Sequence, residues 1–213
     1  GTLGVTGVLT GTSLDISGDI DVDGTTNLDV VDVDGAVNFA ADVTFADGAD
    51  IITASAGTSN FRAGVNAGNS IVSGGNHNTV VGDEAGTALT TGDANVAMGF
   101  QALATEDANG TNTAIGYQSL KTLNAGADGN NTAVGYIAGV FLTTGVNNTL
   151  IGSLAGDALT EGGNNTALGF QALSADTLGS RNTAIGYNTL LVQNFTSATN
   201  SYNVAMGHDA GRA

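Results

Sequence analysis

The chain has 213 residues, with 33 glycines, no proline, cysteine or tryptophan, and only 11% charged residues. So few aromatic residues leave little large apolar surface for one thick hydrophobic core, whereas 41% apolar residues is too many for a chain that stays unfolded through low hydrophobicity. Twenty acidic residues against four basic ones give a formal net charge of −16, which disfavours binding to nucleic acid and to anionic membranes, and no apolar run approaches the roughly 20 residues of a membrane span.

Residues 1 to about 57 are acidic and carry short apolar-x-apolar units, among them Leu14-Asp15-Ile16 and Val43-Thr44-Phe45. Gly or Asp lies between the units, and the segment holds ten of the twenty acidic residues and no basic residue. Alternation of this kind predicts short strands with one buried face and one wet face. We therefore interpret residues 1–57 as a strand-rich shaft segment.

Three acidic residues of this segment, Asp19, Asp21 and Asp23, match the opening of an EF-hand calcium loop. The match fails further on, because Val30 stands where the bidentate Glu is required and no flanking helix is expected. Alternation places the three carboxylates on the solvent face of one strand. They are weak metal candidates, and a solvated face is the default interpretation.

From residue 58 to residue 213 one motif recurs, an Asn followed four residues later by a Gly. Successive Asn anchors are 18, 17, 17, 19, 17, 17, 17 and 21 residues apart, which gives a unit of 17 residues. Such a repeat predicts a solenoid, because no single unit can bury its own face and neighbouring units must stack. The nine anchor pairs are Asn60 and Gly64, Asn78 and Gly82, Asn95 and Gly99, Asn112 and Gly116, Asn131 and Gly135, Asn148 and Gly152, Asn165 and Gly169, Asn182 and Gly186, and Asn203 and Gly207.

Between Asn and Gly the repeat reads Thr, then Ala, then a larger aliphatic residue such as Ile115, Ile151 or Ile185. Because successive strand side chains point to opposite faces, this pattern predicts a short strand with a tight Ala face and a roomier packed face. We expect the aliphatic residues, and the Thr residues that share their face, to point into the stack. The recurring Asn is compatible with either a side-chain ladder along the stack or a turn residue that tolerates left-handed φ.

Residues that support catalysis are few in this chain. His77 and His208 are far apart in sequence, and neither begins a spaced ligand set such as H-E-x-x-H. Paired carboxylates would be needed for glycan hydrolysis, but the acidic residues of the repeats occupy variable positions that are typical of exposed loops. We therefore expect no enzyme activity and no cofactor. The carboxylates in question are Glu84, Glu106, Asp107, Glu161 and Asp176.

Departures from the 17-residue unit are the candidate surface contacts, since insertions in solenoids map to loops on one face, often the binding face. The stretch from Lys121 to Asn130 is one insertion, and the stretch from Leu191 to Tyr202, which includes Phe195, is a longer one. Phe141 adds an apolar side chain without an insertion. Neutral drift of loop sequence is the alternative interpretation.

The units NTAIGYQSL, NTALGFQAL and NTLIGSLAG resemble the repeats of tail fibres from marine and related phages, and more loosely the β-roll of trimeric autotransporter adhesin heads. The resemblance covers residues 60 to 211, and the upstream stretch GTLGVTGVLTGTSLDISGDIDVDG looks like the strand-rich shafts of phage fibres. It implies a homotrimer in which three chains bury the Ala face against one another, and which ends in a receptor-binding tip or an intramolecular chaperone.

The sequence therefore predicts an all-β protein: a parallel β-solenoid or β-roll of 17-residue coils over residues 58–213, expected as an intertwined homotrimer, after the shaft segment 1–57. The expected function is a structural and adhesive segment of a virion tail fibre that presents an end binding a host-surface glycan or protein, with no nucleic acid and no membrane insertion. The alternatives are a bacterial cell-surface trimeric adhesin or extracellular filament subunit, and a monomeric ice- or glycan-binding solenoid. Ice binding requires exposed Thr, and we expect Thr113, Thr132, Thr149, Thr166 and Thr183 to face inward.

Overall fold

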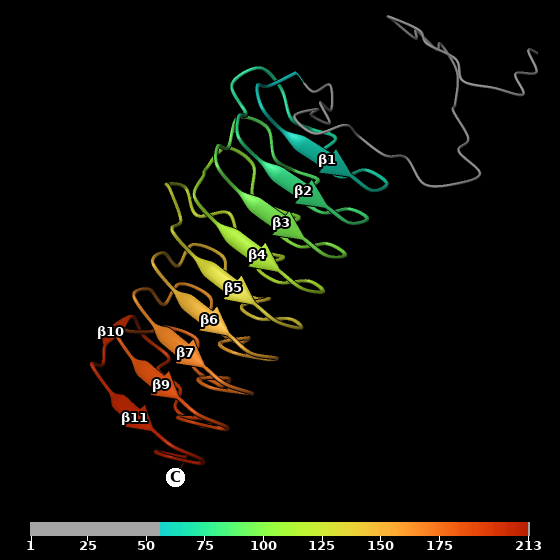
Figure 1. Ribbon diagram of the computed structural model, residues 1–213. Coiled ribbons are helices and arrows are strands. Elements are labelled where there is room, and N and C mark those ends of the chain that lie inside the picture. Colours follow the sequence, from blue (N-terminus) through green and yellow to red (C-terminus); the bar gives the residue numbers. More distant parts are fainter. Residues whose placement is uncertain (1–55, 213) are drawn as a thin grey trace, which may run out of the picture. The chain divides into compact units, whose positions relative to one another are not determined.

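A computed structural model of the chain describes residues 56–212, and these residues form a parallel β-solenoid of stacked coils without any helix (Figure 1). It follows that no membrane-spanning helix occurs in this described part of the chain. The shaft predicted over residues 1–57, with Asp19, Asp21 and Asp23, lies almost entirely outside the described residues.

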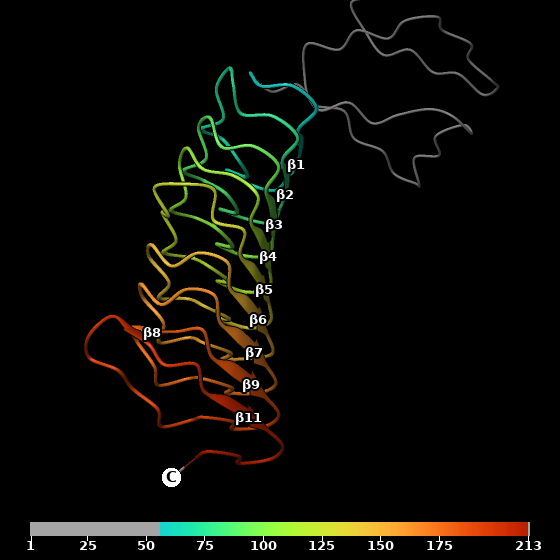
Figure 2. The same ribbon diagram turned by 90° about the vertical axis from the view of Figure 1, so that its left-hand side faces the viewer.

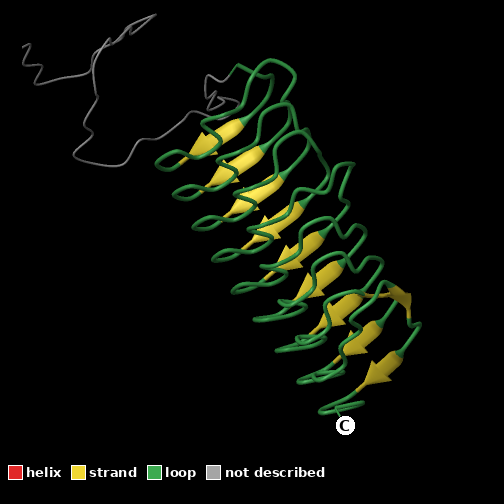
Figure 3. Ribbon diagram, turned by 180° about the vertical axis from the view of Figure 1, so that it is seen from behind, coloured by secondary structure: helices red, strands yellow, loops and turns green. Residues whose placement is uncertain are grey.

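Each coil contributes one three-residue strand to a nine-stranded parallel sheet, and the rest of the coil consists of turns and loops (Figure 3). A second sheet of two parallel strands pairs β8 (Gly179–Ser180) with β10 (Thr199–Asn200). The nine strands are β1 (Phe61–Ala63), β2 (Thr79–Val81), β3 (Val96–Met98), β4 (Thr113–Ile115), β5 (Thr132–Val134), β6 (Thr149–Ile151), β7 (Thr166–Leu168), β9 (Thr183–Ile185) and β11 (Val204–Met206).

The strands pair with equivalent repeat positions opposite one another at every step of the sheet. Thr113 is paired with Thr132, for example, and Ala114 with Ala133. Insertions in the connecting loops leave this register unchanged, since β9 and β11 still align position by position across a 21-residue spacing. The predicted stacking of 17-residue coils is therefore confirmed, and each repeat position forms a column that runs along the stack.

The direction in which the strand side chains point was predicted wrongly. The middle residue of the strand faces the interior, where Ala114, Leu150 and their equivalents from β2 to β9 are fully buried. The Thr and the third aliphatic residue face outward: Ile115, Ile151 and Ile185 are half-buried, and Thr113, Thr132, Thr149, Thr166 and Thr183 share their face. The Ala column is thus part of the core of one chain and is not available for contact with other chains.

The interior is narrow enough that large residues on one side require small ones on the other. Leu150 fills the core from strand β6, and a Cβ atom added at Gly156, across the coil, would come within 2.8 Å of its side chain. In the coil of β4 the sizes are reversed, with Ala114 in the strand and a fully buried Leu120 at the position equivalent to Gly156. Ala in the strands β3, β4, β7 and β9 therefore reflects space that is taken by Leu from the opposite wall.

The anchor Asn residues form a continuous buried ladder, which decides between their two possible roles. The side-chain oxygen of each anchor accepts a hydrogen bond from the backbone N–H of the next anchor, for example Asn165 N–H to Asn148 Oδ1 at 2.9 Å. The left-handed backbone conformation belongs instead to the residue before each anchor, such as Asn147 with φ of 59°. The anchor Asn therefore forms the ladder, and the residue before it forms the turn.

The anchor Gly is required for close approach of successive coils. Gly99 has φ of 128°, a region that L-residues rarely adopt, and a Cβ added there would lie 2.5 Å from the carbonyl oxygen of Gly116. From Gly64 to Gly186 a Cβ in this column would come within 2.8 Å of the next coil's backbone, so a larger residue would push neighbouring coils apart.

Candidate binding surface

The outward side of the nine-stranded sheet carries no charged residue. We define the outer sheet face as the first and third residues of each strand, which lie along one side of the stack (Figure 2). The first column is Phe61, Thr79, Val96, Thr113, Thr132, Thr149, Thr166, Thr183 and Val204, and the second is Ala63, Val81, Met98, Ile115, Val134, Ile151, Leu168, Ile185 and Met206. Residues 56–212 hold ten acidic and four basic residues, a formal net charge of −6, and none of these fourteen side chains lies on the outer sheet face.

Beside the outer sheet face runs a column of stacked rings that the sequence analysis missed. The residue after the anchor Gly begins a turn, and in six coils it is Phe, Tyr or His. Ring centroids of successive coils are 4.9 to 5.4 Å apart in two stacks of three: Phe100, Tyr117 and Tyr136, and then Phe170, Tyr187 and His208. We call this the aromatic column, and the recurrence of an aromatic residue after Gly was the signal that would have revealed it.

Ser153 interrupts the aromatic column between its two stacks. The backbone continues without a break at this point, because Leu154 N–H donates to the carbonyl of Tyr136 and Gln171 N–H donates to the carbonyl of Ser153, both at 3.0 Å. Ser153 therefore occupies the place of a ring without supplying one. Tyr136, whose ring borders Ser153, is 54% exposed, whereas Tyr117, with a ring on each side, is 44% exposed.

A short polar ladder lies next to the first ring stack. Gln118 Nε2 donates to Gln101 Oε1 at 2.8 Å, and Gln101 Nε2 donates to Glu84 Oε2 at 2.6 Å. The next two residues of the same column are Ile137 and Leu154, both half-buried. Ser153 therefore has the apolar Ile137 and Leu154 beside it in this column, and the column becomes polar again at Gln171 in the next coil.

Two acidic residues that we expected in exposed loops are fully buried, which corrects the prediction for Glu106 and Asp176. Both residues occupy the repeat position that holds a buried Leu in other coils, such as Leu89 and Leu159. Glu106 accepts hydrogen bonds from Asn109 and, at 3.3 Å, from the N–H of Ala125. Burial raises the pKa of the Glu106 carboxyl, against the lowering effect of these hydrogen bonds.

Asp176 holds the second insertion, Leu191 to Tyr202, to the stack through hydrogen bonds. It accepts hydrogen bonds from the N–H groups of Gly179 and Phe195 at 3.0 and 3.1 Å and from Gln193 Nε2 at 2.7 Å. These two buried carboxylates lie in separate coils, and each accepts hydrogen bonds from backbone and side-chain amide groups, so they do not form a pair of the kind that glycan hydrolysis requires. Glu84 and Asp107 are half-buried, and Glu161 is exposed.

The predicted surface residues do not converge on one site. Phe195 is half-buried in the inserted loop, and Tyr202, exposed, lies after β10, with the guanidinium of Arg181 5.7 Å from its ring centroid. This two-stranded sheet lies on the side of the stack away from the nine-stranded sheet, as the position of β8 in Figure 2 shows. Phe141 is exposed in its own coil, and Lys121 is half-buried.

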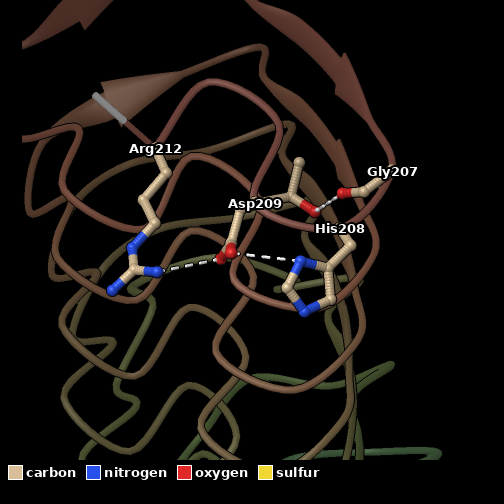
Figure 4. Close-up of polar contacts among 5 residues, drawn as sticks. Gly207, His208, Asp209 and Arg212 are labelled. Atoms are coloured by element: carbon tan, nitrogen blue, oxygen red, sulfur yellow. Dashed lines mark hydrogen bonds and ion pairs between the residues drawn. The ribbon is translucent and has the colours of Figure 1, made fainter.

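The last coil carries the ion pairs found within residues 56–212. His208 Nδ1 lies 3.0 Å from Asp209 Oδ2, and Arg212 Nη1 lies 3.3 Å from Asp209 Oδ1 (Figure 4). All three side chains are solvent-accessible, so these contacts contribute little stability. In the same residue range, no three His or acidic side chains gather as a metal site would require.

Comparison of the chain with protein-family models, with curated proteins and with solved structures gave no match.

Proposed function

We propose that the solenoid is a rod segment of a multi-chain fibre of the phage tail-fibre type, in which three copies associate through their outer sheet faces. The single observation that supports this most is the outer sheet face itself, which carries only apolar and Thr side chains along the whole stack, although residues 56–212 have a formal net charge of −6. At a rise of ~4.8 Å per coil and about 3.3 Å per strand residue, nine strands present a flat area of about 400 Å². An uncharged area of that size is comparable to the largest surface patch of a typical monomer, and such patches are often functional.

The periodicity of the face favours a second copy of the same chain over an unrelated partner. Columns on two identical solenoids have the same rise, so each rung of one meets an equivalent rung of the other along the whole length. A partner with a different rise would lose register within a few coils. Association through the neutral face also keeps the acidic residues of the copies, which repel one another, on the outside of the assembly.

In this proposal the Thr and aliphatic columns replace the Ala column as the contact surface. Half-buried Val134, Ile151 and Ile185 would complete their burial against the other chains. The biological role that follows is a stiff segment that holds a host-surface-binding end at a distance from a virion. A bacterial surface adhesin would use the same rod, and the anchoring segments of the whole protein would distinguish the two.

Sedimentation equilibrium of the whole chain tests the assembly. A trimer has three times the 20.9 kDa mass of the chain, about 63 kDa. Ile151→Glu places a carboxylate on the outer sheet face without touching the core, and we expect it to sediment as a monomer. Phe141→Glu is the matched control, because Phe141 is exposed elsewhere in its coil and should leave the trimer intact. A monomeric wild type, or an unchanged Ile151→Glu trimer, would contradict the proposal.

One observation favours a second candidate, ice binding by a monomer. The Thr column faces outward, contrary to our expectation, and sets five Thr side chains at a constant spacing from β4 to β9. This function needs the outer sheet face to be free, so it excludes the trimer. Thermal hysteresis that a monomeric wild type shows and that Thr149→Asp lacks would favour this candidate.

A further inference from the structure

The gap in the aromatic column at Ser153 has the dimensions of one missing ring. Backbone hydrogen bonds on both sides of Ser153 hold the coils at their normal rise, so the gap cannot close by movement of the coils. At ~4.8 Å per coil, the rings of Tyr136 and Phe170, two coils apart, are separated by about 10 Å. Within the stacks the centroids are 5.3 to 5.4 Å apart on either side of the gap. One further ring between Tyr136 and Phe170 would therefore lie at a normal stacking distance from both.

Only this point of the column offers two open ring faces. Elsewhere successive rings cover one another and expose their edges, as at Tyr117 between Phe100 and Tyr136. The two rings that border the gap are both exposed, Tyr136 to 54% and Phe170 to 39%. A ligand that stacks on aromatic faces has no equivalent place on the rest of the column.

The polarity of the gap indicates the class of ligand. Aromatic faces carry negative charge density and attract the polarised C–H groups of a sugar ring. Two hydroxyl groups border the gap, Tyr136 Oη and Ser153 Oγ, and neither has a hydrogen-bond partner among the described residues. The column beside Ser153 holds no charged residue at this height. Ile137 and Leu154 stand there in place of the polar ladder of the earlier coils.

The net charge of the chain selects among flat ligands. Nucleotides carry phosphates, and acidic sugars carry carboxylates or sulfates. Residues 56–212, with ten acidic and four basic residues, disfavour both kinds of anion. We propose that the gap between Tyr136 and Phe170 over Ser153 binds one neutral pyranose ring of a glycan, with the two ring faces on its two sides. The inference builds on the proposed fibre by giving this segment a glycan site of its own.

Filling the gap with the missing ring is the most direct test. Ser153→Tyr supplies the absent rung and blocks the site while continuing a stack that the protein already tolerates in six coils. Asp83→Tyr is the matched control: position 83 precedes Phe100 in the same column, so the new ring lengthens a stack and leaves the gap open. Phe170→Ala removes one wall of the gap at an exposed position.

Saturation-transfer NMR of the whole chain with maltohexaose, cellohexaose and mannohexaose measures binding to the pyranose C–H groups. We expect transfer with at least one of these probes, a loss of affinity of about tenfold or more in Ser153→Tyr and Phe170→Ala, and a change of less than about twofold in Asp83→Tyr. Absence of transfer from all three probes, or unchanged binding by Ser153→Tyr, would overturn the assignment. Binding of N-acetyltyrosinamide without any sugar would overturn it too, by assigning the gap to an aromatic side chain.

The outcome is separable from that of the fibre proposal. Sedimentation measures the oligomeric state and NMR measures sugar binding, so a trimer that binds no sugar contradicts only the glycan site. A monomer that binds sugar contradicts only the trimer. Sedimentation of Ser153→Tyr alongside wild type shows whether the new ring acts on the gap alone.

Discussion

Removing one anchor Asn from the middle of the ladder should cost far more stability than removing the last one. Asn148 is fully buried, and its amide joins three coils. Its Nδ2 donates to Asn131 Oδ1 at 3.2 Å and to the carbonyl of Gly162 at 3.0 Å, and its Oδ1 accepts from the N–H of Asn165 at 2.9 Å. Asn148→Ala removes all three bonds.

The magnitude follows from the groups that are left without partners. The N–H of Asn165 and the carbonyl of Gly162 are backbone groups in the interior of the stack, and the methyl group of Ala offers nothing in place of the amide. Each buried group without a partner costs about 1–3 kcal/mol, so we expect Asn148→Ala to lower the free energy of unfolding by about 2–6 kcal/mol. A loss of that size is a large part of the stability of an ordinary domain.

Asn203→Ala is the matched control, since Asn203 belongs to the last coil. It is half-buried, its Nδ2 donates to Gln193 Oε1 at 2.6 Å, and within the described residues no later anchor depends on its side-chain oxygen. We expect a loss of about 1 kcal/mol or less. Urea unfolding followed by far-UV circular dichroism, at one fixed chain concentration, gives both values by linear extrapolation. Equal losses for the two variants would refute the view that the ladder stabilises the stack.

The same assay tests two further features of the interior. Leu150→Ala should lower the free energy of unfolding by about 3 kcal/mol. Adding Gly156→Leu should restore more than half of that loss, because Leu120 already fills the equivalent turn with a left-handed φ. A double variant that is no more stable than the single variant would contradict this. For Glu106, burial raises the pKa in the folded chain, so the folded state holds its proton more tightly than the unfolded state. Wild type should therefore lose stability relative to Glu106→Gln as the pH rises from about 4 to 7, and a difference independent of pH would refute the sign.

The 17-residue repeat was enough to predict the stacking of the coils and the position of each strand in the main sheet, for a physical reason. Parallel stacking with equivalent residues opposite one another follows once each unit has the same length and cannot bury its own face. The Asn-to-Gly spacing therefore located every strand of the main sheet between its anchors, including β11 after a 21-residue interval. Insertions altered the loops only, since Asp176 and Glu106 hold them to the stack.

The side chains that face the core were predicted wrongly because the size of each residue was considered within its own strand only. Small Ala114 and large Ile115 alternate, and the larger residue was assigned to the core on hydrophobicity alone. The interior, however, is shared across the coil, and Leu120 from the opposite turn already occupies it. Reading Ala114 with Leu120, and Leu150 with Gly156, would have shown that the middle strand residue and the turn residue compete for one volume.

A uniform column presents the same groups at every coil, so it offers a ligand many equivalent positions and defines no single site. A single interruption removes that degeneracy, because the walls of the gap at Ser153 occur together only once along the aromatic column. The outer sheet face has the opposite property: its first and third strand columns continue across β9 and β11, which suits an interface that must match rung for rung over the whole stack. Regular columns therefore favour assembly between copies, whereas an interrupted column favours recognition of one discrete group, and substituting Ser153 or Ile151 separates the two roles.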